Sequence, residues 1–271
     1  ELVNPMQPPA GKEYDRHWTR KNYDRAYVYA RWQELREKET ETYTDDALSK
    51  ETLNDDYQQL FVTMLLDHVQ HLLTCIKEKK QPEPLRLLLL GTAGSGKTRA
   101  VQTALQEIQR KLAAASLPFD VDPREFVRVA APTGTAAFNL RFHATTVHRL
   151  IHWFTPPFFK TISDDRTLYE LQKQLRNTQL IILDEVSMIG RQMMGRIDSR
   201  MEQAKGYQNE RSESLGGVSC VAVGDPAQCE AMHDQQLYNT TPHKGTANDG
   251  DKQHVQLSNR GLEVYSSFTK V

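Results

Sequence analysis

Residues 85–98 read LRLLLLGTAGSGKT, and this stretch decides the fold class. The apolar run Leu85–Leu90 has the length of a buried strand and is followed directly by glycine. The next eight residues match G-x-x-x-x-G-K-[ST] and lead into a helical pattern over about Lys97–Ala114. A strand, a glycine-rich loop and a helix in this order are the context that a phosphate-binding loop requires. The stretch therefore predicts an α/β domain that binds a nucleotide.

The composition of the loop fits phosphate chemistry. Its glycines allow backbone N–H groups to turn inward around phosphate oxygens, and the start of the next helix adds the positive end of its dipole. We expect Lys97 to reach the β- and γ-phosphates of ATP, and Thr98 to ligate Mg²⁺. Coincidence is the weaker interpretation, because this pattern arises by chance in roughly one chain in a hundred of this length. The predicted nucleotide contacts are Gly91, Thr92, Ala93, Gly94, Ser95, Gly96, Lys97 and Thr98.

Helical and strand patterns alternate around this loop. A strong helical pattern opens at Leu53 and is broken by Gln81–Pro84. Further strands are expected at Phe126–Ala131, Leu180–Leu183 and Val218–Val223. Further helical segments are expected near Ala136–Leu140, Val147–Trp153, Leu168–Leu175 and Met188–Ala204. Repeated βα units predict a mainly parallel sheet with helices on both faces. Residues 240–254 have the composition of a loop.

Polar residues follow two of the expected strands. Asp184 is expected to hold Mg²⁺ through water, and Glu185 to orient and deprotonate an attacking water, because ligands bind at the carboxyl ends of strands in such sheets. The pair favours hydrolysis over phosphate transfer to a small acceptor, and a solvent-facing strand end is the alternative. Gly224–Gln228 closes the last strand similarly. Gln228 is a candidate sensor of the γ-phosphate, although Asp-Pro alone favours a plain turn.

The ordered set of motifs resembles the petite-integration-frequency (PIF-type) DNA helicases, including the helicase portions of Helitron transposons. Gly91–Thr98 is similar to the family's motif I, Ala131–Ala137 to motif Ia, Asp184–Met188 to motif II and Gly224–Gln228 to motif III. Thr145–His148 resembles the T-[IL]-H element that follows motif Ia. The resemblance implies a RecA-like P-loop NTPase domain of an ATP-dependent 5′-to-3′ DNA helicase, with ATP and Mg²⁺ as cofactors. It also implies roles in DNA repair, recombination or telomere maintenance.

The resemblance implies a track for single-stranded DNA as well. In the family, motif Ia lies where the strand crosses the domain, so the implied DNA contacts are Pro132, Thr133, Gly134 and His148. Gln58 is the preferred candidate for the adenine-reading glutamine, although strict spacing from Leu53 points to Tyr57. The chain departs from the family near Arg141–His143, where about two extra residues stand.

Residues 1–50 are expected to form a polar helical appendage and residues 51–271 the first RecA-like domain. The second motor domain, with its arginine finger, is expected to be missing from these 271 residues. Slow hydrolysis and no unwinding are therefore expected of this length of chain. The expected partners are single-stranded DNA and duplex junctions. Two other interpretations remain: a degenerate transposon-derived fragment that binds nucleotide or DNA without turnover, and a different P-loop enzyme such as a nucleotide kinase.

The net charge of −1 excludes a uniformly cationic nucleic-acid binder, so any nucleic-acid contact depends on local basic patches. The three cysteines lack a C-x-x-C pair and are expected to be reduced thiols without zinc. No apolar run approaches the roughly 18 residues that span a bilayer, so we expect a soluble protein without a membrane partner. The chain starts without Met or a leader, as a cut fragment would. An intracellular location is expected, and the resemblance implies the nucleus or the mitochondrion.

Overall fold

The computed structural model describes residues 48–53, 55–115, 122–153, 159–206, 213–242 and 249–270. These residues belong to one compact unit, Ala47–Val271. The predicted appendage over residues 1–50 lies outside the described residues except for residues 48–50. Among the described residues, no helix combines the length and the apolar character needed to cross a membrane.

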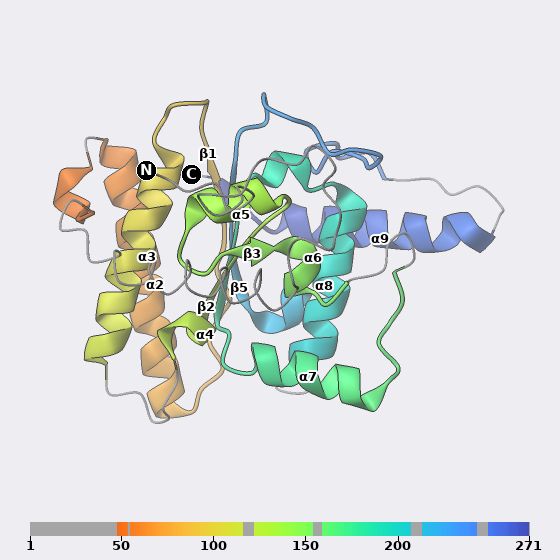
Figure 1. The fold of residues 1–271 in the computed structure, drawn as a ribbon, viewed down its shortest axis with the longest axis horizontal. Coiled ribbons are helices and arrows are strands. Elements are labelled where there is room, and N and C mark those ends of the chain that lie inside the picture. The colour runs from red at the N-terminus through yellow and green to blue at the C-terminus, as the bar shows by residue number, and fades with distance from the viewer. Residues whose placement is uncertain are drawn as a thin grey trace, which may run out of the picture. The chain divides into compact units, whose positions relative to one another are not determined.

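A six-stranded sheet in the order β3-β2-β4-β5-β1-β6 forms the centre of the unit (Figure 1). The strands are β1 (Arg86–Leu90), β2 (Val127–Ala131), β3 (Thr145–Thr146), β4 (Leu180–Leu183), β5 (Ser219–Gly224) and β6 (Thr269–Lys270). Every neighbouring pair is parallel. The four longer strands are almost entirely buried, as their continuous apolar runs predict. The predicted parallel α/β architecture is confirmed.

Helices cover both faces of the sheet (Figure 1). The α-helices are α2 (Asp56–Glu78), α3 (Lys97–Ala114), α4 (Pro123–Phe126), α5 (Gly134–Leu140), α6 (Val147–Leu150), α7 (Asp165–Leu175), α8 (Arg191–Lys205) and α9 (Asp249–Ser266). The short 3₁₀ helices are η1 (Lys50–Thr52), η2 (Val186–Met188) and η4 (Ser214–Gly217). Helices α2 and α3 lie together on one face, and α7, α8 and α9 lie on the other (Figure 1).

Helix α2 forms because its apolar residues recur at helical spacing and bury one stripe against the core. Phe61, Leu65, Val69 and Leu72 are all at most 1% exposed. The Asp55 carboxylate caps the helix start by accepting the N–H of Tyr57 at 2.7 Å. The helix therefore begins at Asp56, three residues after Leu53, where the sequence pattern opened.

Helices α8 and α9 pack at the distance that two glycines permit. A Cβ atom added at Gly195 would lie 2.0 Å from the carbonyl oxygen of Leu257, and one added at Gly261 would lie 1.8 Å from that of Arg191. The two backbones are thus in direct contact. Helix α9 buries Leu257 and Val264 against the core.

Two sequence expectations are wrong here. Residues 249–254, expected as loop, are the first turns of α9, whose stability comes from packing on α8 more than from intrinsic propensity. Residues 243–248 of the same expected loop lie outside the described residues. The helical segment expected over Val147–Trp153 is shorter, because α6 ends at Leu150 and His152 has a positive φ of 50°.

Candidate functional site

All four sequence motifs leave the sheet at its carboxyl edge. The strand register pairs Leu90 of β1 with Gly224 of β5, and Leu183 of β4 with Ala222 of β5 and Ala130 of β2. The segments that follow these strands therefore start side by side at one end of the sheet. In Figure 1 this is the upper end, where α5 begins. Ligands bind at this edge in open parallel α/β sheets.

The glycine-rich loop has the backbone that phosphate binding requires. Gly94 and Gly96 have φ values of 78° and 80°, a left-handed region that other residues rarely adopt. Gly96 directly precedes α3. The loop residues Thr92, Ala93, Gly94, Ser95 and Thr98 are exposed. The start of α3 is thus open to an anion, and its N–H groups are available to it.

Lys97 lies across this loop. Its Nζ donates to the carbonyl oxygen of Gly91 at 2.5 Å and to that of Thr92 at 2.9 Å. The same ammonium acts on Asp184, because its charge lowers the pKa of that carboxyl. Lys97 and Asp184 therefore interact electrostatically at the carboxyl edge of the sheet.

Asp184 is a buried carboxyl, 8% exposed, at the end of β4. Burial raises its pKa to about 6, and the neighbouring charge of Glu185 adds to the rise. The backbone N–H of Glu185 and the charge of Lys97 act in the opposite direction but do not cancel the effect of burial. A carboxylate in this environment is stabilised by a cation placed beside it.

The donor set fits Mg²⁺ carried by a nucleotide. Two residues supply hard oxygen donors: Thr98, an exposed residue in the first turn of α3, and Asp184, which follows β4. The described residues contain no cluster of three or more His, Cys, Asp or Glu side chains that could hold a metal by themselves. Mg²⁺ typically takes one or two protein oxygens and completes its shell with phosphates and water. These residues match that arrangement.

Glu185 has a strained backbone. Its φ and ψ are 50° and 46°, in the left-handed region, and it immediately precedes η2. Non-glycine residues in this region cost roughly 1 to 3 kcal/mol and cluster at functional sites. The turn lets η2 pack tightly on motif III, since a Cβ atom added at Gly224 would lie 2.8 Å from Cγ1 of Val186.

Motif III forms a turn beside the phosphate loop. The N–H of Gly91 donates to the carbonyl oxygen of Gly224 at 3.3 Å. The N–H of Gln228 donates to the carbonyl oxygen of Asp225 at 3.1 Å, and the Asp225 carboxylate accepts the N–H of Ala227 at 3.0 Å. Gln228 itself is exposed. The local geometry is thus the turn that Asp-Pro favours, at the carboxyl edge of the sheet.

Gln58 lies on the phosphate loop. Its Nε2 donates to the carbonyl oxygen of Ser95 at 2.8 Å, and a Cβ atom added at Gly96 would lie 2.5 Å from the same nitrogen. Tyr57, the alternative by spacing, is 74% exposed. The structure therefore brings Gln58, and not Tyr57, against the loop.

The predicted nucleic-acid contacts gather at the neighbouring strands β2 and β3. Pro132 and Thr133 follow β2, and the Thr133 hydroxyl caps α5 by accepting the N–H of Ala136 at 3.2 Å. Gly134 is exposed at the first position of that helix. His148 follows β3, whose Thr146 pairs with Ala131 of β2.

The His148 side chain already packs against a neighbouring residue of the same domain. Its ring stacks on Trp153 with the centroids 4.8 Å apart and the planes at 14°. The guanidinium of Arg196 lies 4.5 Å from the centroid of the Trp153 ring. Burial lowers the pKa of His148, and the Arg196 charge lowers it further. A stacked imidazole leaves little freedom for the side chain to rearrange around a ligand.

The sequence does not reveal two residues, Asp234 and Arg191, that connect the segment after motif III to the first turn of α8, which follows motif II. The Asp234 carboxylate accepts the backbone N–H groups of Gln192 and Met193 at 3.1 and 3.0 Å, capping α8 from the segment after motif III. The fully buried Arg191 donates to the side chain of Gln235 at 2.8 Å. One signal was available: α8 starts after a glycine, without a Ser, Thr, Asp or Asn to cap it.

Comparison with known proteins gives one family. Residues 81–250 match the AAA domain family. No curated protein matches the chain. Three similar solved structures are each much longer than the part that this chain matches.

A Pif1 helicase from Bacteroides in complex with ADP-AlF3 and ssDNA is 21% identical with a TM-score of 0.43, covering 75% of this chain and 36% of its own. Pif1 helicase from Candida albicans is 19% identical with a TM-score of 0.45, covering 66% and 34%. Bacteroides Pif1 bound to ssDNA is 27% identical with a TM-score of 0.39, covering 63% and 34%. The chain spans about a third of the length of these solved structures.

Proposed function

The chain belongs to the AAA domain family, and from this premise we propose that it binds ATP with Mg²⁺ and hydrolyses it as the motor domain of a DNA helicase. One observation carries the proposal. Lys97 crosses a glycine loop with the backbone of a phosphate cradle, and the buried Asp184 lies within its electrostatic reach at the same edge of the sheet. A loop suited to phosphates, an ammonium on that loop and a buried carboxylate that a cation would stabilise together suit a metal-bound triphosphate.

Each residue then has a defined role. The amides of Gly91–Thr98 and the ammonium of Lys97 hold the phosphates. Thr98 and Asp184 would hold Mg²⁺, which supplies charge neutralisation at the phosphates when bound. Glu185 orients and deprotonates the attacking water. Gln228 senses the terminal phosphate.

Gln58 is proposed to contact the adenine base. Its Nε2 is already engaged by the loop carbonyl of Ser95, so its Oε1 is the group left to accept a hydrogen bond from the base. An amide held on the loop in this way links base recognition to loop conformation.

The motor assignment rests on the ordered motif set, which resembles PIF-type helicases. Single-stranded DNA is proposed to pass along Pro132, Thr133, Gly134 and His148, which the fold gathers at the ends of β2 and β3. The start of α5 offers backbone N–H groups to a phosphate without reading the sequence. Unwinding with 5′-to-3′ polarity at duplex junctions, in the nucleus or the mitochondrion, is proposed for a longer protein in which a second RecA-like domain supplies an arginine to the ATP cleft.

Hydrolysis and binding measured side by side test the proposal. We expect the wild-type protein to bind ATP with Mg²⁺, to hydrolyse it slowly and to respond to single-stranded DNA. The Lys97→Ala variant should lose both binding and turnover, because the phosphates lose their main cation. Turnover that ignores DNA, or that survives in Lys97→Ala, would refute the motor assignment.

The same measurements separate the two alternatives. A degenerate fragment binds nucleotide but shows no turnover with or without DNA. A nucleotide kinase transfers phosphate to a small acceptor, which a screen for phosphorylated products detects. We expect inorganic phosphate as the product, because the proposed role of Glu185 is to activate water.

A further inference from the structure

Phe138 is an aromatic side chain, 58% exposed, on α5 beside the proposed DNA track. A single exposed apolar residue is ordinary on a protein surface. Three further observations make this one informative: the anchoring of the segment that follows it, the charges carried by the stretch of sequence that contains it, and its position relative to Gly134.

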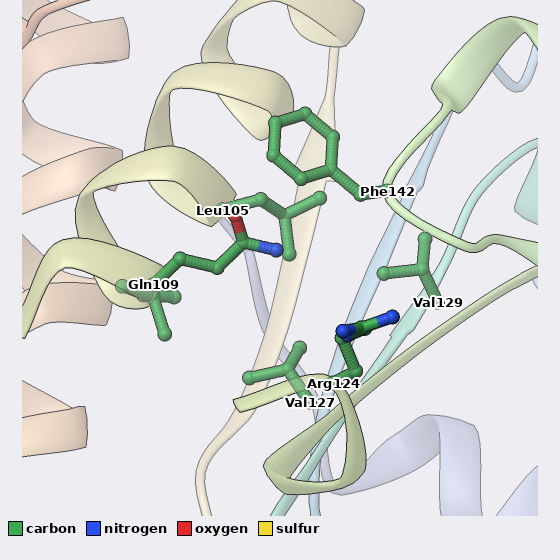
Figure 2. A pocket seen from close by; sticks show the side chains of 7 residues that line it. Leu105, Gln109, Arg124, Val127, Val129 and Phe142 are labelled. Atoms are coloured by element: carbon green, nitrogen blue, oxygen red, sulfur yellow. The ribbon is translucent and has the colours of Figure 1, made fainter. Parts of the chain in front are cut away.

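The segment after α5 is anchored in a strained conformation. Arg141, Phe142 and His143 have φ values of 61°, 48° and 55°, three successive non-glycine residues in the left-handed region. Such residues persist only where surrounding structure holds them. Phe142 is 6% exposed and lines a pocket with Leu105 of α3 and Val129 of β2 (Figure 2).

The buried position of Phe142 determines that Phe138 is the phenylalanine exposed to solvent. Phe142 fills the space between α3 and β2, whereas α5 ends at Leu140, which is 1% exposed. Ala137 and Leu140 hold the other side of α5 against the domain. Phe138 therefore stays on the solvent side of a short helix that is tied down at both ends.

The sequence around Phe138 contains no carboxylates. The chain has 35 Asp and Glu residues, yet none stands between Glu125 and Asp164. The same interval carries the exposed cations Arg141, Arg149 and Lys160. An exposed aromatic ring in a basic stretch free of acidic residues matches a polyanion that carries aromatic bases.

The geometry of α5 relates Phe138 to the proposed phosphate contact. Gly134 and Phe138 are four residues apart, so they lie on one face of the helix, about 6 Å apart along its axis. Both are exposed. A strand whose phosphate meets the helix start at Gly134 would bring an adjoining base toward the ring.

We infer that Phe138 is a stacking platform for one base of single-stranded DNA. The inference rests on the proposed function, because it takes the strand to run along motif Ia. Stacking on an aromatic ring tolerates any base, so this contact would add affinity without sequence preference. It would also fix the register of the strand relative to the phosphate contact at the start of α5.

Tyr169 provides a matched control. It is an aromatic residue that is 62% exposed, on α7, which leads into the amino end of β4. In Figure 1, α5 lies at the upper end of the sheet and α7 at the lower end. Removing either ring changes surface hydrophobicity similarly, but only Phe138 lies beside the proposed track.

The experiment measures binding of a fluorescent oligothymidylate by anisotropy. Phe138→Ala should weaken binding by about 5-fold or more, the range that the loss of one stacked base gives. Phe138→Trp should retain affinity and Tyr169→Ala should leave it unchanged. An oligonucleotide with abasic sites through its middle should erase the difference between wild type and Phe138→Ala. The slope of binding against salt concentration should stay the same, because no charge is removed.

The outcomes separate the two levels of the argument. If the wild-type protein does not bind the oligonucleotide, the proposed function fails, and this inference fails with it. If the wild-type protein binds and Phe138→Ala binds equally well, only the stacking inference is overturned. An equal loss on abasic DNA would also overturn it, because that loss would mark a structural role. Phe138→Leu, which keeps an apolar side chain without a ring, should behave as the alanine variant does and guards against misfolding.

Discussion

Replacing Asp184 with asparagine is expected to stabilise the ligand-free protein at alkaline pH while removing hydrolysis. The folded protein holds the pKa of this carboxyl at about 6, against an ordinary value of 3.8, chiefly because the group is buried. The fold thus favours the protonated form. The stability that this group contributes is fully present below about pH 4 and is lost as the pH rises through 6. Asparagine has nearly the same shape and stays neutral throughout.

The difference between the ordinary pKa of 3.8 and the pKa of about 6 in the folded protein sets the size of the expected change in stability. Complete titration corresponds to about 3 kcal/mol, of which about 1 kcal/mol is lost between pH 5 and pH 8. Urea denaturation of wild type and Asp184→Asn at both pH values isolates this part, because most other titrating groups are common to the two proteins. The wild type should lose about 1 kcal/mol more than the variant over this interval. Lys97→Met, which removes the cation that lowers the pKa of Asp184, should widen the loss.

A ligand arm completes the test. At pH 8, Mg²⁺ with a non-hydrolysable ATP analogue should raise the denaturation midpoint of the wild type more than that of Asp184→Asn, because only the carboxylate gains from the metal. Parallel pH profiles for the two proteins would refute the argument that the site stores an unfavourable buried charge. If the wild type instead gains stability relative to the variant between pH 5 and pH 8, the pKa of Asp184 is lowered by folding and not raised.

Three further substitutions test packing and nucleotide contacts. Gly261→Ala places a Cβ atom 1.8 Å from the carbonyl oxygen of Arg191. Urea denaturation should therefore show a free energy of unfolding lower by about 2 kcal/mol or more, despite the higher helix propensity of alanine. The control Gly206→Ala, where the nearest atom is 3.6 Å away, should show no such loss. Gly224→Ala intrudes to 2.8 Å on the side chain that follows Glu185, and steady-state kinetics should show a fall in kcat larger than the change in KM for ATP; the reverse pattern would count against it. Gln58→Ala should weaken ATP binding in calorimetry more than the binding of inorganic triphosphate, and an equal loss for both ligands would contradict a base contact.

The sequence predicts those parts of the fold whose signal is local. Strands β1 and β4 are continuous apolar runs, and the loop between β1 and α3 is a motif with fixed spacing. Strands β3 and β6 have two residues each, which is too short for any periodicity to register. The sequence does not predict helix α9, because few of its residues are apolar and Gly261 lowers its helix propensity. Gly261 permits a close approach to α8, but this contact exists only in the folded protein and leaves no local pattern in the sequence.

The site divides in the same way. Spacing alone leaves Tyr57 and Gln58 as competing candidates, and only the position of the side chain over Gly96 separates them. The uncapped start of α8 signals that some cap is needed, but the sequence does not identify Asp234 as that cap, because the helix start lies 42 residues earlier in the chain. Motif positions are therefore readable from the sequence, whereas the contacts that hold motifs together are not.

Those contacts link the phosphate loop to both neighbouring motifs. Motif II runs into η2 and then α8, whose first turn is capped by Asp234 from the segment after motif III. Arg191 ties the same turn to the carbonyl oxygen of Ser258 in α9 at 3.2 Å, and α9 is followed by β6, which pairs with β1 at Leu87 and Leu88. Because β1 ends at the phosphate loop, the chain of contacts closes on itself. A shift of Asp184 toward a bound cation must then be accommodated by α8, α9 and the motif III turn together, since packed elements rearrange between discrete states more readily than they deform.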